Sequence, residues 1–190
     1  MKKAFTLSEM LVCFAIIAAL LAIFLSTIRV KPNTNMVMFR KAYNTTTSVV
    51  SEMLQSAMYY ESGSLSVKDA TSETINGEKP SENTKFCKVF AHFINTIEQP
   101  DCTAGAGVSF TTPDGIDWYM PPKTTNGSFT ANETIRVDVN GVDNIPNCAD
   151  GAEGCDVPDI FEFTVEESGK IFINGDIAKQ YLQNTRNISK

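Results

Sequence analysis

Side chains that carry oxygen crowd one stretch in the C-terminal third of the chain. Carboxylate, amide and backbone carbonyl oxygens are the ligands that Ca²⁺ prefers in proteins. Asp138-Val139-Asn140-Gly141-Val142-Asp143-Asn144 forms the start of this stretch, and further along come Asp150, Glu153, Asp156 and Asp159. The first candidate calcium ligands are Asp138, Asn140, Asp143 and Asp159.

The spacing of this stretch departs from that of an EF-hand loop. Val142 occupies the third ligand position, Gly141 comes too early, and no Glu closes the loop at its twelfth position. The alternative is a polar loop, closed by a disulfide, in which Asn and Asp serve turn geometry. The sequence leaves both interpretations open.

Cysteine is used in two different settings. Cys13 lies within a long apolar run and behaves there as a small hydrophobic residue, whereas Cys87, Cys102, Cys148 and Cys155 follow downstream. An even number beyond an apolar segment predicts two disulfides in an oxidising compartment, and four cysteines allow three connectivities. We favour Cys87–Cys102 and Cys148–Cys155, because each closes a short, turn-rich loop. A zinc site built from the same four cysteines is the rival interpretation, and the lack of a Cys-x-x-Cys pair argues against it.

Motifs of enzymes are missing from the sequence. It contains no Gly-x-Ser-x-Gly, no His-Glu-x-x-His and no Gly-rich phosphate loop. A Cys nucleophile needs a His partner, and His92 is the only histidine. The net charge of -6, without any run of Lys or Arg, argues against nucleic acid as a partner. We therefore expect a protein that is not an enzyme.

The N-terminal segment has the composition of a membrane helix. Residues 10–28 contain no charged side chain, no Gly and no Pro. At about 1.5 Å per residue, such a helix spans roughly the hydrocarbon thickness of a bilayer. Lys2 and Lys3 precede the run and favour a cytoplasmic N-terminus. A carboxylate at the start of an apolar helix is costly to insert, so Glu9 is expected to have a functional partner.

The residues around Glu9 resemble a known processing signal. The stretch Lys2-Lys3-Ala4-Phe5-Thr6-Leu7-Ser8-Glu9-Met10-Leu11-Val12 is similar to the signal of type IV prepilins and of the pseudopilins of type II secretion. In that family a peptidase cuts after a small residue and before a Phe, methylates the new N-terminus, and leaves a Glu as the fifth mature residue. Counted from Phe5, Glu9 is the fifth residue. The chain departs from the family in having Ala4 in place of the usual Gly, and Ser8 in place of an apolar residue. A plain signal anchor is the alternative.

This resemblance implies a domain organisation and a set of partners. It implies a leader over residues 1–4, a transmembrane and assembly helix over 5–31, and a periplasmic or extracellular globular domain over 32–190. The implied partners are other copies of the chain, a prepilin peptidase, an inner-membrane platform protein and an assembly ATPase. The chain would cross the inner membrane once with its N-terminus in the cytoplasm. Some pseudopilins bind calcium in a loop of their C-terminal sheet, which adds to the case for the acidic loop.

Periodicity beyond the apolar run predicts helices first and strands afterwards. A break at Pro32 is followed by an amphipathic helix over residues 35–60, a polar loop over 61–84 with an Asn76-Gly77 turn, and a helix over 86–97. Alternation then predicts strands at 108–112, 116–120, 134–139, 160–165 and 170–173. The first two form a hairpin around Pro113-Asp114-Gly115, and the last two form another around Ser168-Gly169. Residues 176–187 form a helix or a tail. The expected fold is α+β, with a long N-terminal helix packed on an antiparallel sheet, as in pilins.

The sequence thus favours a structural subunit of a type IV pilus or of a type II secretion pseudopilus. One alternative is a minor pilin that displays a binding module, for which Trp118 and Tyr119 with Met120-Pro121-Pro122 form the candidate adhesive surface. Another is a membrane-anchored, secreted enzyme with a metal in the acidic loop.

Overall fold

The chain divides into two compact units, Met1–Asn33 and Thr34–Lys190. The computed structural model describes residues 7–27, 33–65, 73–80, 84–103, 107–121 and 132–183. Within these residues, the first unit contains helix α1 (Leu7–Thr27), and the second contains three helices and five strands. The α+β class predicted from the sequence is confirmed.

The sheet of the second unit is an antiparallel meander in which neighbours in the sequence are neighbours in space. Its strands are β1 (Phe110–Thr111), β2 (Asp117–Tyr119), β3 (Asn132–Asp138), β4 (Ile160–Glu166) and β5 (Ile171–Ile173). The two predicted hairpins, β1–β2 and β4–β5, are both present. The longest pairing joins β3 to β4 over seven residue pairs, so this pair forms the centre of the sheet.

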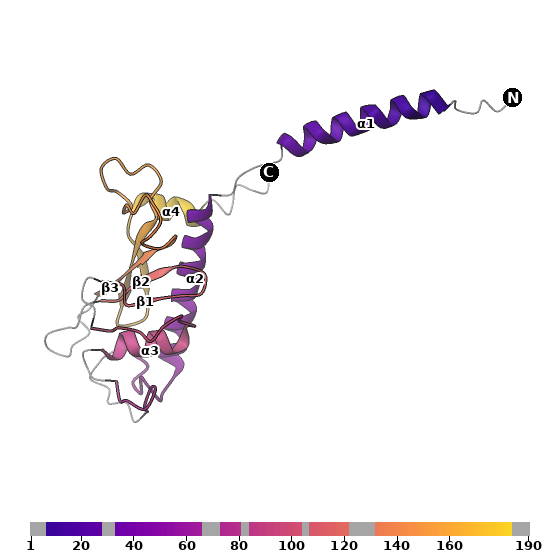
Figure 1. Ribbon diagram of the computed structural model, residues 1–190. Coiled ribbons are helices and arrows are strands. Elements are labelled where there is room, and N and C mark those ends of the chain that lie inside the picture. Colours follow the sequence, from indigo (N-terminus) through magenta and orange to yellow (C-terminus); the bar gives the residue numbers. More distant parts are fainter. Residues whose placement is uncertain are drawn as a thin grey trace. The chain divides into compact units, whose positions relative to one another are not determined.

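Helix α2 (Thr34–Gln55) packs against the sheet through one stripe of side chains (Figure 1). The stripe recurs at three- and four-residue spacing, as expected for an amphipathic helix. Its buried members are Phe39, Ala42, Thr46, Val49, Val50 and Met53. The ring of Phe39 lies 4.5 Å from that of Phe161 and 5.7 Å from that of Phe163, centroid to centroid, which fixes the helix over the middle of the sheet.

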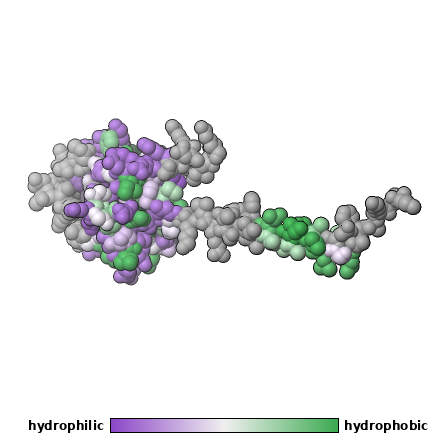
Figure 2. Space-filling view, turned by 90° about the horizontal axis from the view of Figure 1, so that it is seen from above, coloured by the Kyte–Doolittle hydropathy of each residue, from purple (hydrophilic) through white to green (hydrophobic). Residues whose placement is uncertain are grey.

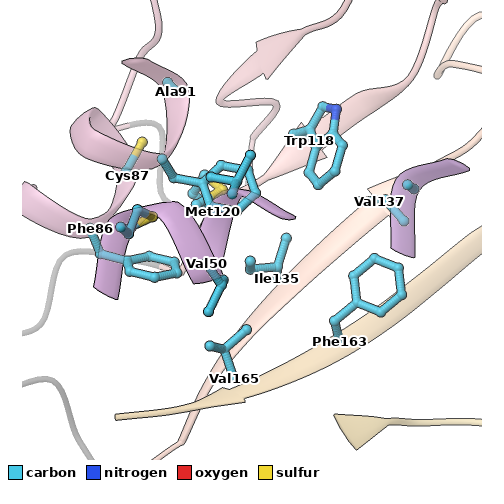
Figure 3. Close-up of a cluster of buried hydrophobic side chains, with 14 of the residues drawn as sticks. Val50, Phe86, Cys87, Ala91, Trp118, Met120, Ile135, Val137, Phe163 and Val165 are labelled. Carbon is cyan, nitrogen blue, oxygen red and sulfur yellow. The ribbon is translucent and has the colours of Figure 1, made fainter. Parts of the chain in front are cut away.

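The sheet turns alternate side chains of its central strands toward this helix. Ile135 and Val137 of β3 and Phe161, Phe163 and Val165 of β4 are all at most 1% exposed. Figure 3 shows Val50 of α2 facing this layer, with Trp118 and Met120 of the β2 region beside it. Burial of this layer supplies the main driving force for folding of the unit.

Helix α2 ends earlier than its periodicity predicts. It stops at Gln55 rather than at residue 60, and the chain turns through Ser56, whose carbonyl accepts hydrogen bonds from the backbone N–H groups of Tyr59 and Tyr60. The turn buries both rings, which are 7% and 1% exposed. Burial of these two aromatic side chains therefore ends the helix at Gln55, although the apolar spacing predicts that the helix continues to residue 60.

Two short helices lie near opposite ends of α2 (Figure 1). Helix α3 (Lys85–Phe93) ends at Ile94, which is extended with φ −115° and ψ 146°, so the predicted continuation to residue 97 is wrong. Of the helix or tail that the sequence left open after residue 176, the structure shows helix α4 (Asp176–Gln183), whose Ala178 and Tyr181 are buried.

The β4–β5 turn approaches α2 closely at Gly169. The residue has φ +80°, and a Cβ added there would overlap Cδ1 of Leu54 and lie 3.3 Å from Cγ1 of Val50. Gly115, with φ +82°, has no atom within 4 Å of the same position. We expect both Gly→Ala changes to cost about 1–2 kcal/mol through backbone strain, and Gly169→Ala to cost about 1 kcal/mol more because Leu54 must move.

Chemical denaturation of the two single variants measures this difference. Equal losses in the free energy of unfolding would mean that the Leu54 contact contributes nothing.

Candidate functional site

Helix α1 carries an apolar surface on every described side. Leu7 is 83% exposed, and Leu11, Phe14 and Leu20 are each more than 60% exposed within the single chain. Figure 2 shows this helix as a hydrophobic surface, in contrast to the largely hydrophilic surface of the second unit. A helix that is apolar all round is stable only when another helix or a lipid phase covers it.

Among the described side chains, no helix reaches the length and hydropathy that define a membrane span.

The residues of the processing signal lie at or before the start of this helix. Ala4 and Phe5 lie outside the described residues. Glu9 lies in the first turn of α1, and its side chain is not among those described. Cys13 follows one turn later and is a free, exposed thiol.

A row of three buried aspartates crosses one end of the sheet. Asp117 of β2 lies directly opposite Asp138 of β3 in the strand register. Asp138 in turn pairs with Ile160 of β4, which directly follows Asp159. Asp138 and Asp159 are 0% exposed and Asp117 is 6% exposed. Like charges opposite one another in a sheet are destabilising, so this row needs compensation.

Hydrogen bonds compensate two of the three carboxylates. Asp159 accepts from the backbone N–H groups of Asn147 (2.8 Å) and Cys148 (2.7 Å). Asp117 accepts from the hydroxyl of Thr111 and from the backbone N–H of Val142 (2.9 Å). Three of the four donors, the backbone N–H groups of Val142, Asn147 and Cys148, belong to the β3–β4 loop, so these bonds tie this loop to the end of the sheet.

Only one of the two carboxylate oxygens of Asp138 accepts hydrogen bonds. Its Oδ1 accepts from the backbone N–H groups of Asn140 (3.2 Å) and Gly141 (3.0 Å). Its Oδ2 is buried without a hydrogen-bond partner, and so is Oδ1 of Asn140. A buried acceptor that lacks a donor costs about 1–3 kcal/mol. Oδ2 of Asp138 is therefore suited to receive a proton or a cation, and Oδ1 of Asn140 is suited to receive a cation.

Burial raises the pKa of Asp138, and the negative charges of Asp159 and Asp117 raise it further. The folded chain then binds this proton more tightly than the unfolded chain. Without divalent cations, we expect the free energy of unfolding to fall as pH rises from about 3.8 through the raised pKa of Asp138. Asp138→Asn removes the titrating group, so the free energy of unfolding of this variant should fall less over the same pH range.

Urea denaturation of both proteins between pH 3 and pH 8, in the presence of a chelator, measures the effect. Parallel pH profiles for the two proteins would contradict it.

The structure brings together only part of the predicted calcium site. Asp138 and Asn140 lie in one turn, but Asp143 is exposed and both oxygens of Asp159 accept backbone hydrogen bonds. Within the described residues, no group of three or more His, Cys, Asp or Glu side chains is arranged to hold a metal ion. An open pocket of about 380 Å³ adjoins the row, with Asp117, Asn140 and Asp143 in its lining. Asp117 was missed from the sequence because it lies about twenty residues upstream, and only strand register brings it here.

Disulfides join the four downstream cysteines in the pairs Cys87–Cys102 and Cys148–Cys155. With every one of these sulfurs in a disulfide, the rival zinc site has no thiolate ligands. The second disulfide closes the segment that donates to Asp159.

The aromatic candidates for adhesion belong to the core instead. Trp118 is 1% exposed and Met120 is 3% exposed, and the indole N–H donates to the hydroxyl of Thr112. Tyr119 is half-buried under the guanidinium of Arg136, 4.1 Å from the ring centroid. His92, the only histidine, is exposed.

Residues 1–25 match the family described as the prokaryotic N-terminal methylation motif. The chain therefore carries an N-terminal signal of the type IV pilin and pseudopilin kind. The match supports a type IV pilin-like protein, from a class that is generally structural rather than enzymatic. No curated protein and no solved structure matches the chain.

Proposed function

We propose that the chain is a structural subunit that assembles, through its N-terminal helix, into a type IV pilus or a type II secretion pseudopilus. The observation that carries this proposal is the methylation motif at residues 1–25 on a helix whose described side chains are apolar and exposed. Such a helix needs copies of itself or lipid around it, and a filament core supplies the first while the membrane supplies the second.

Each residue of the signal has a role in this proposal. Residues 1–4 form the leader, a prepilin peptidase cuts between Ala4 and Phe5, and the amine of Phe5 is methylated. The carboxylate of Glu9 then pairs with the amine of a neighbouring subunit, because opposite charges attract strongly in an apolar environment. Residues 5–31 form the anchoring and assembly helix, and residues 32–190 form the displayed domain.

The proposed setting follows from the same segment. Before assembly the chain crosses the inner membrane once, with Lys2 and Lys3 in the cytoplasm and the disulfide-bonded domain in the periplasm. Assembly uses an inner-membrane platform protein and a cytoplasmic ATPase, and an extended filament would carry the domain outside the cell.

Genetic removal of the prepilin peptidase tests this proposal. We expect the chain to appear in filaments sheared from cells that contain the peptidase, and to remain in the membrane fraction of cells that lack it. A chain that stays in the membrane of both strains, even when overproduced, would contradict assembly.

Calcium binding is a second proposed function, favoured by the unpartnered buried oxygens of Asp138 and Asn140. These two atoms are the kind of oxygen ligands that Ca²⁺ takes, and Asp117 and Asp143 border the same pocket. A bound cation would also offset the repulsion among the buried carboxylates. Asp159 would serve by holding the loop through its backbone hydrogen bonds.

Thermal denaturation with calcium and with a chelator tests this second function. We expect calcium to raise the melting temperature of the wild-type chain and not that of Asp138→Asn, since ligands stabilise the state that binds them. Glu153→Gln, an exposed change in the same loop, is the matched control and should keep the response. No shift of the wild type with calcium would contradict the site.

A further inference from the structure

Two exposed aliphatic side chains lie in the first part of the β3–β4 loop. Ile145 is 88% exposed and Val142 is 52% exposed. In Figure 1 this loop, drawn in orange, extends beyond the sheet at the end where α2 begins. Single exposed aliphatic side chains are common on protein surfaces, so their meaning depends on how the loop holds them and on what surrounds them.

The amide side chains of this loop hold its own backbone. Asn140 donates through Nδ2 to the carbonyl of Ile145 (3.2 Å), and Asn144 donates through Nδ2 to the carbonyl of Asn140 (2.7 Å). Asn147 donates through Nδ2 to the carbonyl of Val142 (2.8 Å). The loop thus turns amide groups onto its own backbone and leaves aliphatic side chains exposed to solvent. A loop that is held in this way loses little conformational entropy when its exposed side chains bind a partner.

Negative charge surrounds the two aliphatic side chains. Residues 139–159 contain no Lys, Arg or His, and their acidic residues are Asp143, Asp150, Glu153, Asp156 and Asp159. Of these, Asp143, Glu153 and Asp156 are exposed. Anionic lipid surfaces and nucleic acids are negatively charged and would repel this loop. The loop is therefore suited to a protein surface that is apolar and positively charged.

The first part of α2 is a surface of this kind. Residues 10–51 contain no acidic residue, and their basic residues are Arg29, Lys31, Arg40 and Lys41. Val37 is 48% exposed, and Lys41 follows it by four residues, so the two side chains lie on one face of the helix. Lys41 pairs with Asp114 (2.8 Å), and its side chain remains 57% exposed. Exposed aliphatic side chains thus have acidic neighbours on the loop and basic neighbours on the helix.

From these observations we propose that Val142 and Ile145 of one subunit dock on the face of α2 around Val37 and Lys41 of a second copy of the chain. This inference rests on the proposed filament and adds a contact between the second units of neighbouring subunits. The loop and the helix face are both exposed in the single chain, so each copy offers its loop to one neighbour and its helix to another. Such a contact is heterologous and continues from copy to copy, as a filament requires.

Cross-linking within filaments tests this contact. Val37→Cys and Ile145→Cys are introduced together into a Cys13→Ser chain, because Cys13 is the thiol that lies outside the two disulfides. We expect a short bismaleimide, added to sheared filaments, to give a ladder of dimers, trimers and longer species after denaturation. Chains with only one of the two new cysteines should stay monomeric.

The pair Met58→Cys and Ile145→Cys is the matched control, since Met58 is 55% exposed and follows the far end of α2. It should give no ladder. An equal ladder from this control, or the absence of a ladder from the pair at Val37 and Ile145, would overturn the contact. A product that stops at the dimer would overturn the heterologous arrangement.

Ile145→Asp provides an arm that needs no new cysteine. Because the side chain is 88% exposed, we expect an unchanged melting temperature, and we expect the filament yield to fall at least about tenfold through loss of an apolar anchor. Met58→Asp should keep the wild-type yield. A wild-type yield from Ile145→Asp would overturn the role of Ile145.

Failure of this contact and failure of the proposed function give different results. Filaments that form from the chain with cysteines at positions 37 and 145, but that do not cross-link, would overturn the contact alone. A wild-type chain that forms no filaments would overturn the proposed function, and the contact with it.

Discussion

Replacing Glu9 by Gln is expected to abolish filament assembly while the second unit still folds. The change removes the only acidic residue before Glu52. In the proposed filament it would leave the methylated amine of Phe5 without a counter-charge at the apolar boundary. Loss of one partner from a buried ion pair costs about 3–5 kcal/mol, which corresponds to a loss of at least about a hundredfold in association. Quantification of the chain in sheared filaments against the membrane fraction measures this effect.

Two comparisons make the Glu9 result specific. Glu52→Gln, in the exposed face of α2, changes the net charge equally and should leave assembly intact. Glu9→Asp keeps the charge on a shorter side chain and should retain part of the assembly. If Glu9→Gln gave as many filaments as the wild type, this result would contradict the proposed role of Glu9 in assembly.

Replacing Phe39 by Ala is expected to have the largest effect on folding. Phe39 is 0% exposed, and its ring contacts those of Phe161 and Phe163 of β4 and of Tyr181 of α4. A Phe→Ala change in a packed core costs about 3–5 kcal/mol, a large part of the stability of a domain of this size. The free energy of unfolding, from urea denaturation of the disulfide-intact chain, measures it.

Val37→Ala is the matched control, because Val37 lies on the same helix and is 48% exposed. It should cost less than about 0.5 kcal/mol. Similar losses for the two variants would mean that α2 is not anchored through Phe39.

The elements set by local chemistry were predictable from the sequence. The β1–β2 turn has Gly115 in the left-handed region, with φ +82°, and the Asn76-Gly77 turn has φ +52° and φ +83° at its two residues. These conformations are what Gly and Asn favour, so the turns could be placed before the strands were seen. Alternation also placed β3 and β4 within two residues of their observed limits.

The ends of the helices depended on contacts that the sequence does not reveal. Helix α2 stops at Gln55 because Tyr59 and Tyr60 find buried positions beyond it. The apolar spacing of Ala57 and Met58 continues the helical pattern, yet Met58 is 55% exposed. The local apolar spacing does not reveal whether Tyr59 and Tyr60 are buried by a longer helix or by a turn after it. That outcome depends on the surface against which the two rings pack, and distant parts of the chain supply this surface.

The acidic site shows the same limit. Asp138 and Asn140 were predicted from their spacing within one turn, and the structure leaves a buried oxygen of each without a donor. The neighbouring charge is Asp117 rather than Asp143, because the pairing of β2 with β3 places Asp117 opposite Asp138. Asp150 was grouped with the same acidic stretch, but it binds the N-terminus of α4. One acidic stretch in the sequence thus contributes to two different structures. Strand pairing places Asp138 beside Asp117, and Asp150 caps the N-terminus of α4.

The N-terminus of the mature chain is the most direct test of the proposed function. Mass spectrometry of protein purified from its native membrane is expected to find a chain that begins at methylated Phe5, as cleavage after Ala4 requires. That result would establish prepilin-type processing, from which assembly through the N-terminal helix follows. A chain that still begins at Met1 or Lys2 would contradict the proposal and leave an ordinary membrane anchor.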